Sequence, residues 1–245
     1  MPTNLRRKTR SVIVALKEGS PISWTKEKAL AVIREVAVIP VVRVSTREQA
    51  TCAVEGIIDA GMPVVEITLT VPGALQIIED LATTYGPKLL VGAGTVLDVE
   101  TCRTAILAGA EFVVSPVFDA RVVESSRRYG KICMPGALTP TEALAAWQAG
   151  ADLVKIFPCG SVGGPAYIRA LKGPFPQIEF VVTGSVNREN VGQFLAAGVT
   201  AVGVGETVLE RAAIEAGDVA TITANARRFL DAIKSARSKE ERLKV

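Results

Sequence analysis

The amino-acid sequence predicts a single α/β domain of the (β/α)8 TIM-barrel class, preceded by a helical or flexible extension. Helical patterns ending in Ala-Gly recur before short apolar runs, at Ala60-Gly61, Ala108-Gly109, Ala149-Gly150 and Ala197-Gly198. The intervals of 48, 41 and 48 residues are about twice the length of one helix–strand unit. Further apolar runs between them bring the number of expected strands to eight. A chain of 245 residues suits one such barrel.

Residues 1–34 are expected to form a basic arm or an added helix ahead of the barrel domain, residues 35–235. Segment 1–17 contains five basic and no acidic side chains (Arg6, Arg7, Lys8, Arg10, Lys17), so the rest of the chain carries +3 − 5 = −2. The nearly neutral body argues against a nucleic-acid partner. The apolar stretch 12–16 is shorter than the roughly 7–15 residues of a signal-peptide core. Residues 236–245 are expected to be a charged C-terminal tail.

The eight expected strands are apolar runs typical of strands buried on both faces. In chain order they lie near 38–44, 64–67, 89–92, 112–114, 132–135, 153–156, 179–182 and 201–204. A helical pattern follows each run, and the glycine at the end of several of these helices is expected to adopt the left-handed conformation. A closing helix is expected over about 219–234. A doubly wound open sheet is the alternative, but eight evenly spaced units favour a closed barrel.

Composition excludes several kinds of site. The chain has no histidine, which rules out a Ser-His-Asp triad and a His-ligated zinc site, and no metal is expected. Four scattered cysteines without a CxxC pair (Cys52, Cys102, Cys133, Cys159) fit reduced thiols in a cytoplasmic protein. No apolar run is long enough to span a bilayer, so no membrane association is expected. Acid–base chemistry must then come from a carboxylate, lysine, cysteine or tyrosine.

Lys155 is the most informative single residue, because it lies in the apolar run 153–156 and lysine is almost never fully buried without a partner or a task. Loss of hydration favours the neutral amine, which is a nucleophile toward carbonyl carbon. The alternatives are a side chain that reaches the strand end, or a structural ion pair. This strand alone does not separate them.

Glu66 is expected to face Lys155 inside the barrel, since side chains alternate along a strand. Lys155 shares its side of the strand with Phe157, and Glu66 shares its side with Thr68 and Thr70. A purely structural Glu66–Lys155 ion pair is the alternative. Such buried pairs stabilise poorly after desolvation, which favours a chemical role.

Other strand ends supply groups for a small polar pocket. Arg43 ends the first strand and suits carboxylate recognition. The third strand ends in the small residues 92–95, which let a ligand approach the backbone. Ser115-Pro116 ends the fourth strand, and Met134-Pro135-Gly136 ends the fifth.

With these motifs in their order and spacing, the chain resembles the class I 2-keto-3-deoxy-6-phosphogluconate (KDPG) aldolase and 4-hydroxy-2-oxoglutarate aldolase family over roughly residues 36–234. The matching segments are Val65–Thr68, Val91–Val96, Ser115-Pro116, Met134–Gly136 and Val154–Pro158. The resemblance implies that Lys155 forms a Schiff base with pyruvate, and that Glu66 shuttles protons, through water or directly. It also implies a carboxylate site at Arg43 and Thr95, substrate contacts from Pro116 and Phe157, no cofactor and a homotrimer.

The resemblance further implies a phosphate site in the turns after strands six, seven and eight. Its residues would be Gly163, Gly164, Gly184, Ser185, Gly205 and Glu206. The chain departs from the family where Thr70 replaces a common arginine, where Ser185 replaces the second glycine of Gly-Gly, and where Glu206 replaces the serine of Gly-Ser. Backbone N–H groups could still bind an anion there. A carboxylate at Glu206 would repel a phosphate dianion unless it points away.

The expected function is cleavage of a 2-keto-3-deoxy sugar acid, KDPG and also 4-hydroxy-2-oxoglutarate, to pyruvate and an aldehyde. Another imine-forming keto-acid lyase is an alternative, because the fold permits both reactions. A weakly active chain that serves as an oligomeric scaffold is the other. The expected partners are a small-molecule substrate and copies of the same chain.

Overall fold

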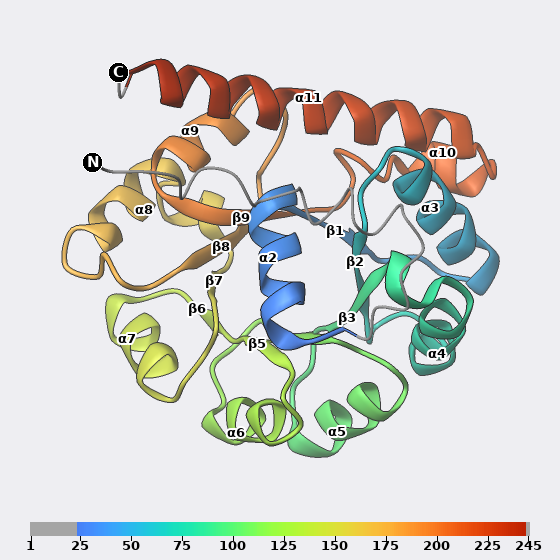
Figure 1. Cartoon of the computed structure of the whole chain (residues 1–245), viewed down its shortest axis with the longest axis horizontal. Helices are drawn as coiled ribbons and strands as arrows, with labels where there is room; N and C mark the ends of the chain where they lie inside the picture. The colour runs from blue at the N-terminus through green and yellow to red at the C-terminus, as the bar shows by residue number, and fades with distance from the viewer. Residues whose placement is uncertain (1–23, 244–245) are drawn as a thin grey trace, which may run out of the picture.

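The computed structural model describes residues 24–243, which form a barrel of parallel strands surrounded by helices (Figure 1). The strands are β1 (Val38–Val42), β2 (Val64–Thr68), β3 (Leu90–Gly94), β4 (Phe112–Val114), β5 (Ile132–Met134), β6 (Gly136–Ala137), β7 (Val154–Ile156), β8 (Phe180–Thr183) and β9 (Val199–Val204). Their order is β5-β4-β3-β2-β1-β9-β8-β7-β6, and every pairing is parallel. The predicted (β/α)8 class is confirmed.

The nine segments are the eight predicted strands, with the fifth divided at Pro135. Proline has no N–H to donate to a neighbouring strand, so the ladder changes partner there. On one side of the break, the Ser115 N–H donates to the Met134 carbonyl at 3.2 Å. On the other side, the Lys155 N–H donates to the Pro135 carbonyl at 2.9 Å. The divided strand therefore joins β4 to β7 and closes the ring.

The helices alternate with the strands as predicted. They are α2 (Lys26–Val36), α3 (Arg47–Asp59), α4 (Ala74–Tyr85), α5 (Val99–Leu107), α6 (Ala120–Arg128), α7 (Pro140–Gln148), α8 (Pro165–Lys172), α9 (Val191–Ala196), α10 (Arg211–Glu215) and α11 (Val219–Leu243), with 3-10 turns η1 (Gly86–Lys88) and η2 (Cys159–Val162). Thr139 and Glu142 form a reciprocal cap on α7. The four Ala-Gly glycines all have φ between 87° and 109°, which confirms the predicted left-handed helix ends.

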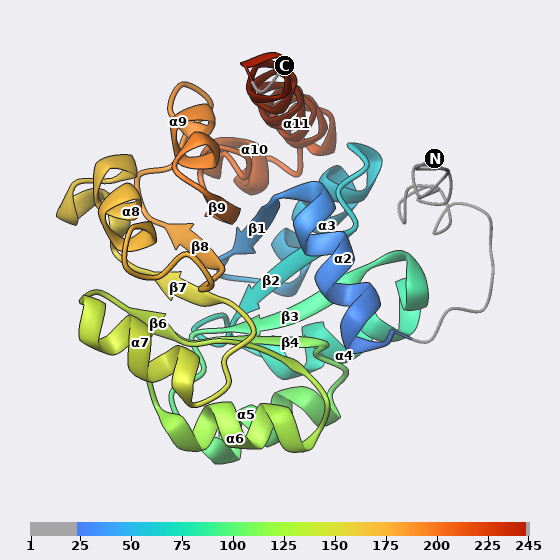
Figure 2. The ribbon, with the colours of Figure 1, turned by 60° about the vertical axis from the view of Figure 1, so that its left-hand side comes forward.

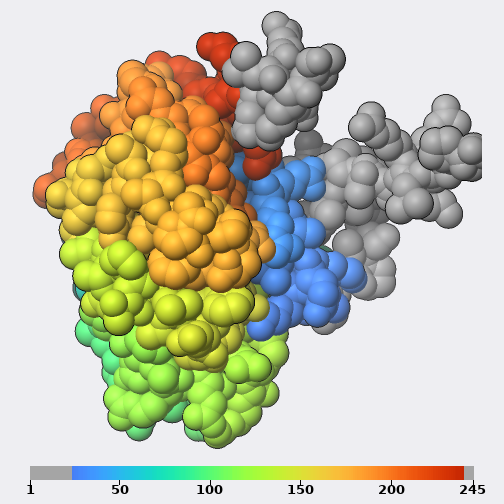
Figure 3. All heavy atoms as spheres, turned by 90° about the vertical axis from the view of Figure 1, so that its left-hand side faces the viewer, coloured from blue at the N-terminus to red at the C-terminus, as the bar shows by residue number. Residues whose placement is uncertain are grey.

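Helix α2 covers the amino-terminal end of the barrel, which we call the floor; the carboxyl-terminal end is the mouth. In Figure 1 this helix crosses the centre of the ring, and in Figure 3 it stands in blue at one edge of the molecule. Its apolar face, which includes Val32 and Ile33, is fully buried. Part of the expected extension is therefore a helix. The basic side chains Arg6, Arg7, Lys8, Arg10 and Lys17 lie outside the described residues.

Helix α11 runs to Leu243, past the expected end at Lys234 and through most of the segment expected to be a tail. Its buried residues Ile222, Phe229 and Ile233 recur at helical spacing and pack on α3 and α9 (Figure 2). Arg237 attaches the C-terminal half of α11 to α2, because its guanidinium donates to the carbonyls of Arg34 and Glu35 at 2.7 and 2.6 Å. Among the described helices, none is long and apolar enough to cross a membrane.

Candidate active site

Lys155 lies at the centre of β7 with 6% of its surface exposed. Its register partners are Gly136 on β6 and Val181 on β8. A Cβ at Gly136 would overlap the backbone of Pro116, so only glycine fits there, and its absence of a side chain lets the Pro116 turn pack against β6 next to the lysine strand. The Lys155 Nζ lies 5.2 Å from the centroid of the Phe157 ring, in range of a cation–π contact. The amine is thus held in the barrel interior beneath an aromatic ring.

Glu66 lies at the centre of β2 with 3% of its surface exposed. A Cβ at Gly94 would overlap the Glu66 carboxylate, so glycine at the end of β3 makes room for the acid. Burial raises the pKa of the Glu66 carboxyl, and the positive charges of Lys155 and Arg43 act in the opposite direction. The group therefore keeps a proton to higher pH than an exposed glutamate.

Lys155 and Glu66 face the same interior from opposite sides of the ring, because β1, β9 and β8 separate their strands on one side. They influence each other electrostatically, but among the side chains described, those of residues 24–239, they form no direct ion pair and neither makes a side-chain hydrogen bond. In that range, Trp24 Nε1 is the only fully buried side-chain nitrogen or oxygen atom without a hydrogen-bond partner, so the Lys155 amine and the Glu66 carboxylate are not fully buried. The amine and the carboxylate therefore reach accessible space, where a substrate could meet both.

The remaining residues expected to contact the carboxylate and carbon chain of a substrate also lie at the mouth. Thr95 follows β3 with φ at 61°, a left-handed backbone that costs about 1–3 kcal/mol for a β-branched residue. Such strain concentrates at functional sites. Arg43 follows β1 and is exposed, Pro116 is half-buried, and the Phe157 ring is 37% exposed.

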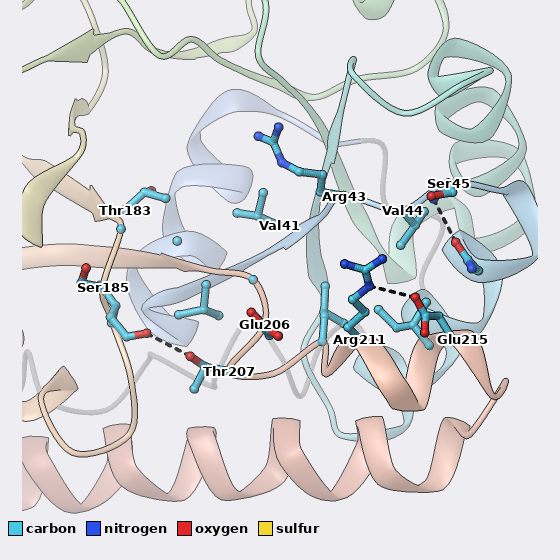
Figure 4. Close-up of a pocket in the computed structure, with 18 residues that line it drawn as sticks. Val41, Arg43, Val44, Ser45, Thr183, Ser185, Glu206, Thr207, Arg211 and Glu215 are labelled. Carbon is cyan, nitrogen blue, oxygen red and sulfur yellow. Dashed lines mark hydrogen bonds and ion pairs between the residues drawn. The ribbon is translucent and has the colours of Figure 1, made fainter.

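A cavity of about 730 Å³ opens between the ends of β1, β8 and β9 (Figure 4). Arg43 and four residues of the expected phosphate site line it, namely Gly184, Ser185, Gly205 and Glu206. Lys155 and Glu66 are not part of this lining, so the cavity lies beside these two residues and not around them. Its size is typical of a small-molecule site.

Gly163 and Gly164 do not line this cavity. Both of their N–H groups donate to the Cys159 carbonyl, the Gly164 bond being 3.1 Å long. The turn satisfies its own donors, and these two glycines offer no free N–H to an anion. By contrast, the N–H groups of Gly184 and Ser185 have no acceptor among the described residues.

Two charged residues that the sequence did not single out also line the cavity. Arg211 begins α10, and its Nε donates to Glu215 Oε1 at 2.8 Å. This bond, and more weakly the charge of Glu206, raises the pKa of the Arg211 guanidinium. An Arg–Glu pair at spacing i,i+4 is typical of any exposed helix, so the sequence carried no signal that it faces a pocket.

The site can supply a nucleophilic amine, a tunable acid and anion-binding groups from one end of the barrel. Among the side chains that the structure describes, those of residues 24–239, no cluster of three or more histidine, cysteine, aspartate or glutamate residues could hold a metal ion.

Comparison with known proteins places the whole barrel in one family. The family model for KDPG and KHG aldolases matches residues 30–225. The 2-dehydro-3-deoxy-6-phosphogalactonate aldolase of Escherichia coli K12 is 38% identical over 172 residues, 70% of this chain and 83% of that protein. The 2-dehydro-3-deoxy-phosphogluconate aldolase of Treponema pallidum is 34% identical over 201 residues, 82% of this chain and 95% of that protein.

A solved structure shows the same fold with a trapped intermediate. It is the KDPG aldolase of Legionella pneumophila with pyruvate captured at low pH as a covalent carbinolamine. The two chains are 30% identical and superpose with a TM-score of 0.76, covering 81% of this chain and 96% of that one.

Proposed function

This chain belongs to the KDPG and KHG aldolase family, and we propose that it is a Schiff-base aldolase that cleaves a 2-keto-3-deoxy sugar acid to pyruvate and an aldehyde. The observation that carries the proposal is the buried Lys155 amine, unpaired within the described structure and facing the buried Glu66 carboxyl across the barrel mouth. KDPG and 4-hydroxy-2-oxoglutarate belong to the substrate class that such a site would accept.

In the first step the Lys155 amine attacks the C2 carbonyl and forms a carbinolamine. Protonated Glu66 gives its proton to the C2 hydroxyl, which leaves as water, and an iminium remains. Glu66 is suited to hold that proton because burial raises the pKa of its carboxyl. The carbinolamine captured in the Legionella relative is the corresponding intermediate with pyruvate.

In the second step the C3–C4 bond breaks. Glu66, now a carboxylate, takes the proton of the C4 hydroxyl directly or through water, and the aldehyde leaves. The bonding electrons move to the iminium, which becomes an enamine and needs no metal ion as electron sink. A proton then returns to C3, and water releases pyruvate and restores the amine. The positive iminium favours ionised Glu66, so one group serves as acid and then as base.

The surrounding residues are proposed to position the substrate. Arg43 and the strained backbone at Thr95 would hold the carboxylate, and Phe157 and Pro116 would shield the carbon chain from water. A homotrimer and a cytoplasmic location remain predictions.

The test is pyruvate formation from 2-keto-3-deoxygluconate and from its 6-phosphate, measured with and without EDTA. We expect activity on at least one substrate, insensitive to EDTA, and a loss of about 1,000-fold or more in Lys155→Met. Lys88→Met is the matched control, because Lys88 is an exposed lysine in η1. Absence of pyruvate with both substrates would contradict the proposal and favour the scaffold alternative. Release of carbon dioxide or water without cleavage would favour the other keto-acid lyase.

A further inference from the structure

The 730 Å³ cavity beside the reactive pair is balanced in charge. Its charged lining residues are two cations, Arg43 and Arg211, and two anions, Glu206 and Glu215, and the other lining residues are uncharged. Figure 4 shows Arg211 joined to Glu215, with Glu206 nearby on the loop that leads from β9 to α10. The cavity therefore has no net positive charge to offer a dianion.

The two arginines are not equally available. Arg211 already donates to Glu215 at 2.8 Å and also feels the charge of Glu206. Arg43 comes from the end of β1 and, under the proposed function, holds the carboxylate of the substrate. Once Arg43 is used in this way, the charges left in the cavity are +1 for Arg211, −1 for Glu206 and −1 for Glu215, a sum of −1.

Hydroxyl and amide groups make up most of the polar lining that remains. Ser45, Gln49, Thr183 and Ser185 contribute neutral donors and acceptors. The N–H groups of Gly184 and Ser185 also line the cavity without an acceptor among the described residues, and they can donate to a hydroxyl oxygen as well as to an anion. Carboxylate and neutral oxygen acceptors suit a sugar hydroxyl, which can donate a hydrogen bond, whereas a phosphate dianion cannot.

We propose that this cavity binds the distal end of the substrate and selects unphosphorylated 2-keto-3-deoxy sugar acids. Glu206 accepts a hydrogen bond from a terminal hydroxyl and repels a phosphate group at the same place. This inference rests on the proposed function and narrows its substrate class. Glu206 acts here as a specificity-determining residue, with no part in the bond cleavage.

The experiment compares kcat/KM for 2-keto-3-deoxygluconate and for its 6-phosphate. We expect the wild-type enzyme to favour the unphosphorylated acid by about tenfold or more. In Glu206→Gln, which keeps the shape and removes the charge, kcat/KM should fall several-fold for the unphosphorylated acid and rise about tenfold or more for the phosphate. Glu189→Gln is the control, because Glu189 is an exposed acid in the loop after β8 that does not line the cavity, and it should leave the ratio unchanged.

Two further measurements separate the possible failures. Borohydride reduction in the presence of pyruvate reports Schiff-base formation at Lys155. Because pyruvate lacks the distal part of a sugar acid, this measurement does not depend on what the cavity binds. If an adduct forms but the wild-type enzyme prefers the phosphate, or Glu206→Gln leaves the ratio unchanged in a variant that melts like wild type, the inference is overturned and the proposed function stands. If no adduct forms and neither acid is cleaved, both are overturned.

Discussion

The charged residues at the floor of this barrel have ion-pair partners, whereas the two buried charged residues at its mouth have none among the described residues. At the floor, the Asp152 carboxylate contacts Lys26 Nζ at 2.8 Å and accepts the Cys133 N–H at 2.9 Å. Glu179, also at the floor, accepts two bonds from the Arg34 guanidinium at 2.6 and 3.0 Å. At the mouth, Glu66 and Lys155 are more deeply buried, yet neither has a direct partner in the part of the chain that the structure describes.

Under the proposed function, this difference separates charges that stabilise the fold from charges that take part in catalysis. An ionised group that loses water without gaining a partner costs free energy, so it is retained only where it has a task. Glu179 at the floor and Glu66 at the mouth differ in the direction in which the pKa of each carboxyl is shifted. Hydrogen bonds from Arg34 lower the pKa of the Glu179 carboxyl, whereas burial raises the pKa of the Glu66 carboxyl.

The largest expected effect of removing a mouth charge is on the rate. Glu66→Gln keeps the shape of the side chain but cannot transfer a proton, so we expect kcat to fall about 10²–10⁴-fold. The melting temperature should stay the same or rise, since a costly buried acid is removed. Glu179→Gln is the matched floor variant and should leave kcat within about twofold of wild type. Similar loss of kcat in both variants would abolish the distinction between mouth and floor.

Removing a floor charge should instead lower stability. Asp152→Ala deletes the Lys26 contact and leaves the Cys133 N–H without its acceptor, so we expect the free energy of unfolding in urea to fall by about 2 kcal/mol. kcat/KM should be unchanged at a temperature where the variant is folded. Asp231→Ala, which removes an exposed pair with Lys234, should cost less than about 0.5 kcal/mol. Equal costs for the two variants would show that the floor contact is no stronger than a surface pair.

The two glutamates should also give stability curves of opposite slope against pH. The folded-state pKa of Glu66 is raised above its ordinary value of 4.5. Its contribution to the free energy of unfolding is therefore fully present below pH 4.5 and is lost as the pH rises through the folded-state pKa. Wild type should therefore lose stability relative to Glu66→Gln over that interval, by about 1.4 kcal/mol for each unit of the shift. Urea unfolding at a series of pH values measures this loss.

For Glu179 the folded-state pKa is lowered, so its contribution to the free energy of unfolding is present above pH 4.5. That contribution is lost as the pH falls through the folded-state pKa. Wild type should lose stability relative to Glu179→Gln in acid. Parallel curves for the two variants would contradict the contrast between the two ends.

The smallest expected effect concerns the ring above the amine. Phe157→Leu removes the cation–π contact at 5.2 Å but keeps an apolar cover, so we expect a change of about two- to fivefold in kcat/KM. Phe175→Leu, a half-buried phenylalanine away from the cavity lining, is the control for general loss of packing. An unchanged kcat/KM in Phe157→Leu would mean that the ring has no influence on the amine.

Strand periodicity made the barrel and the interior positions of Lys155 and Glu66 predictable from the sequence. Alternation along short buried strands places Lys155 and Glu66 in the interior once eight strands are recognised, since one face of each strand must point inward. The Ala-Gly helix ends were equally predictable, because the glycines adopt φ values that other residues avoid.

The parts that depend on loops and on long-range pairing were not predictable in the same way. Nothing local shows that the turns of Gly163 and Gly164 use their own N–H groups, or that Arg211 faces a cavity. The floor pair of Arg34 and Glu179 joins residues 145 positions apart. The continuation of α11 past Lys234 was missed because its charged residues are as typical of a solvated helix as of a tail.

Trapping with borohydride tests the role of the unpaired amine most directly. Wild-type protein, Lys155→Met and Lys88→Met are each treated with pyruvate and sodium borohydride, and the adducts are mapped by mass spectrometry of peptides. Our account predicts one reduced pyruvyl group on Lys155 in wild type and in Lys88→Met, and none in Lys155→Met. Modification of another lysine, or an unmodified wild-type chain, would contradict it.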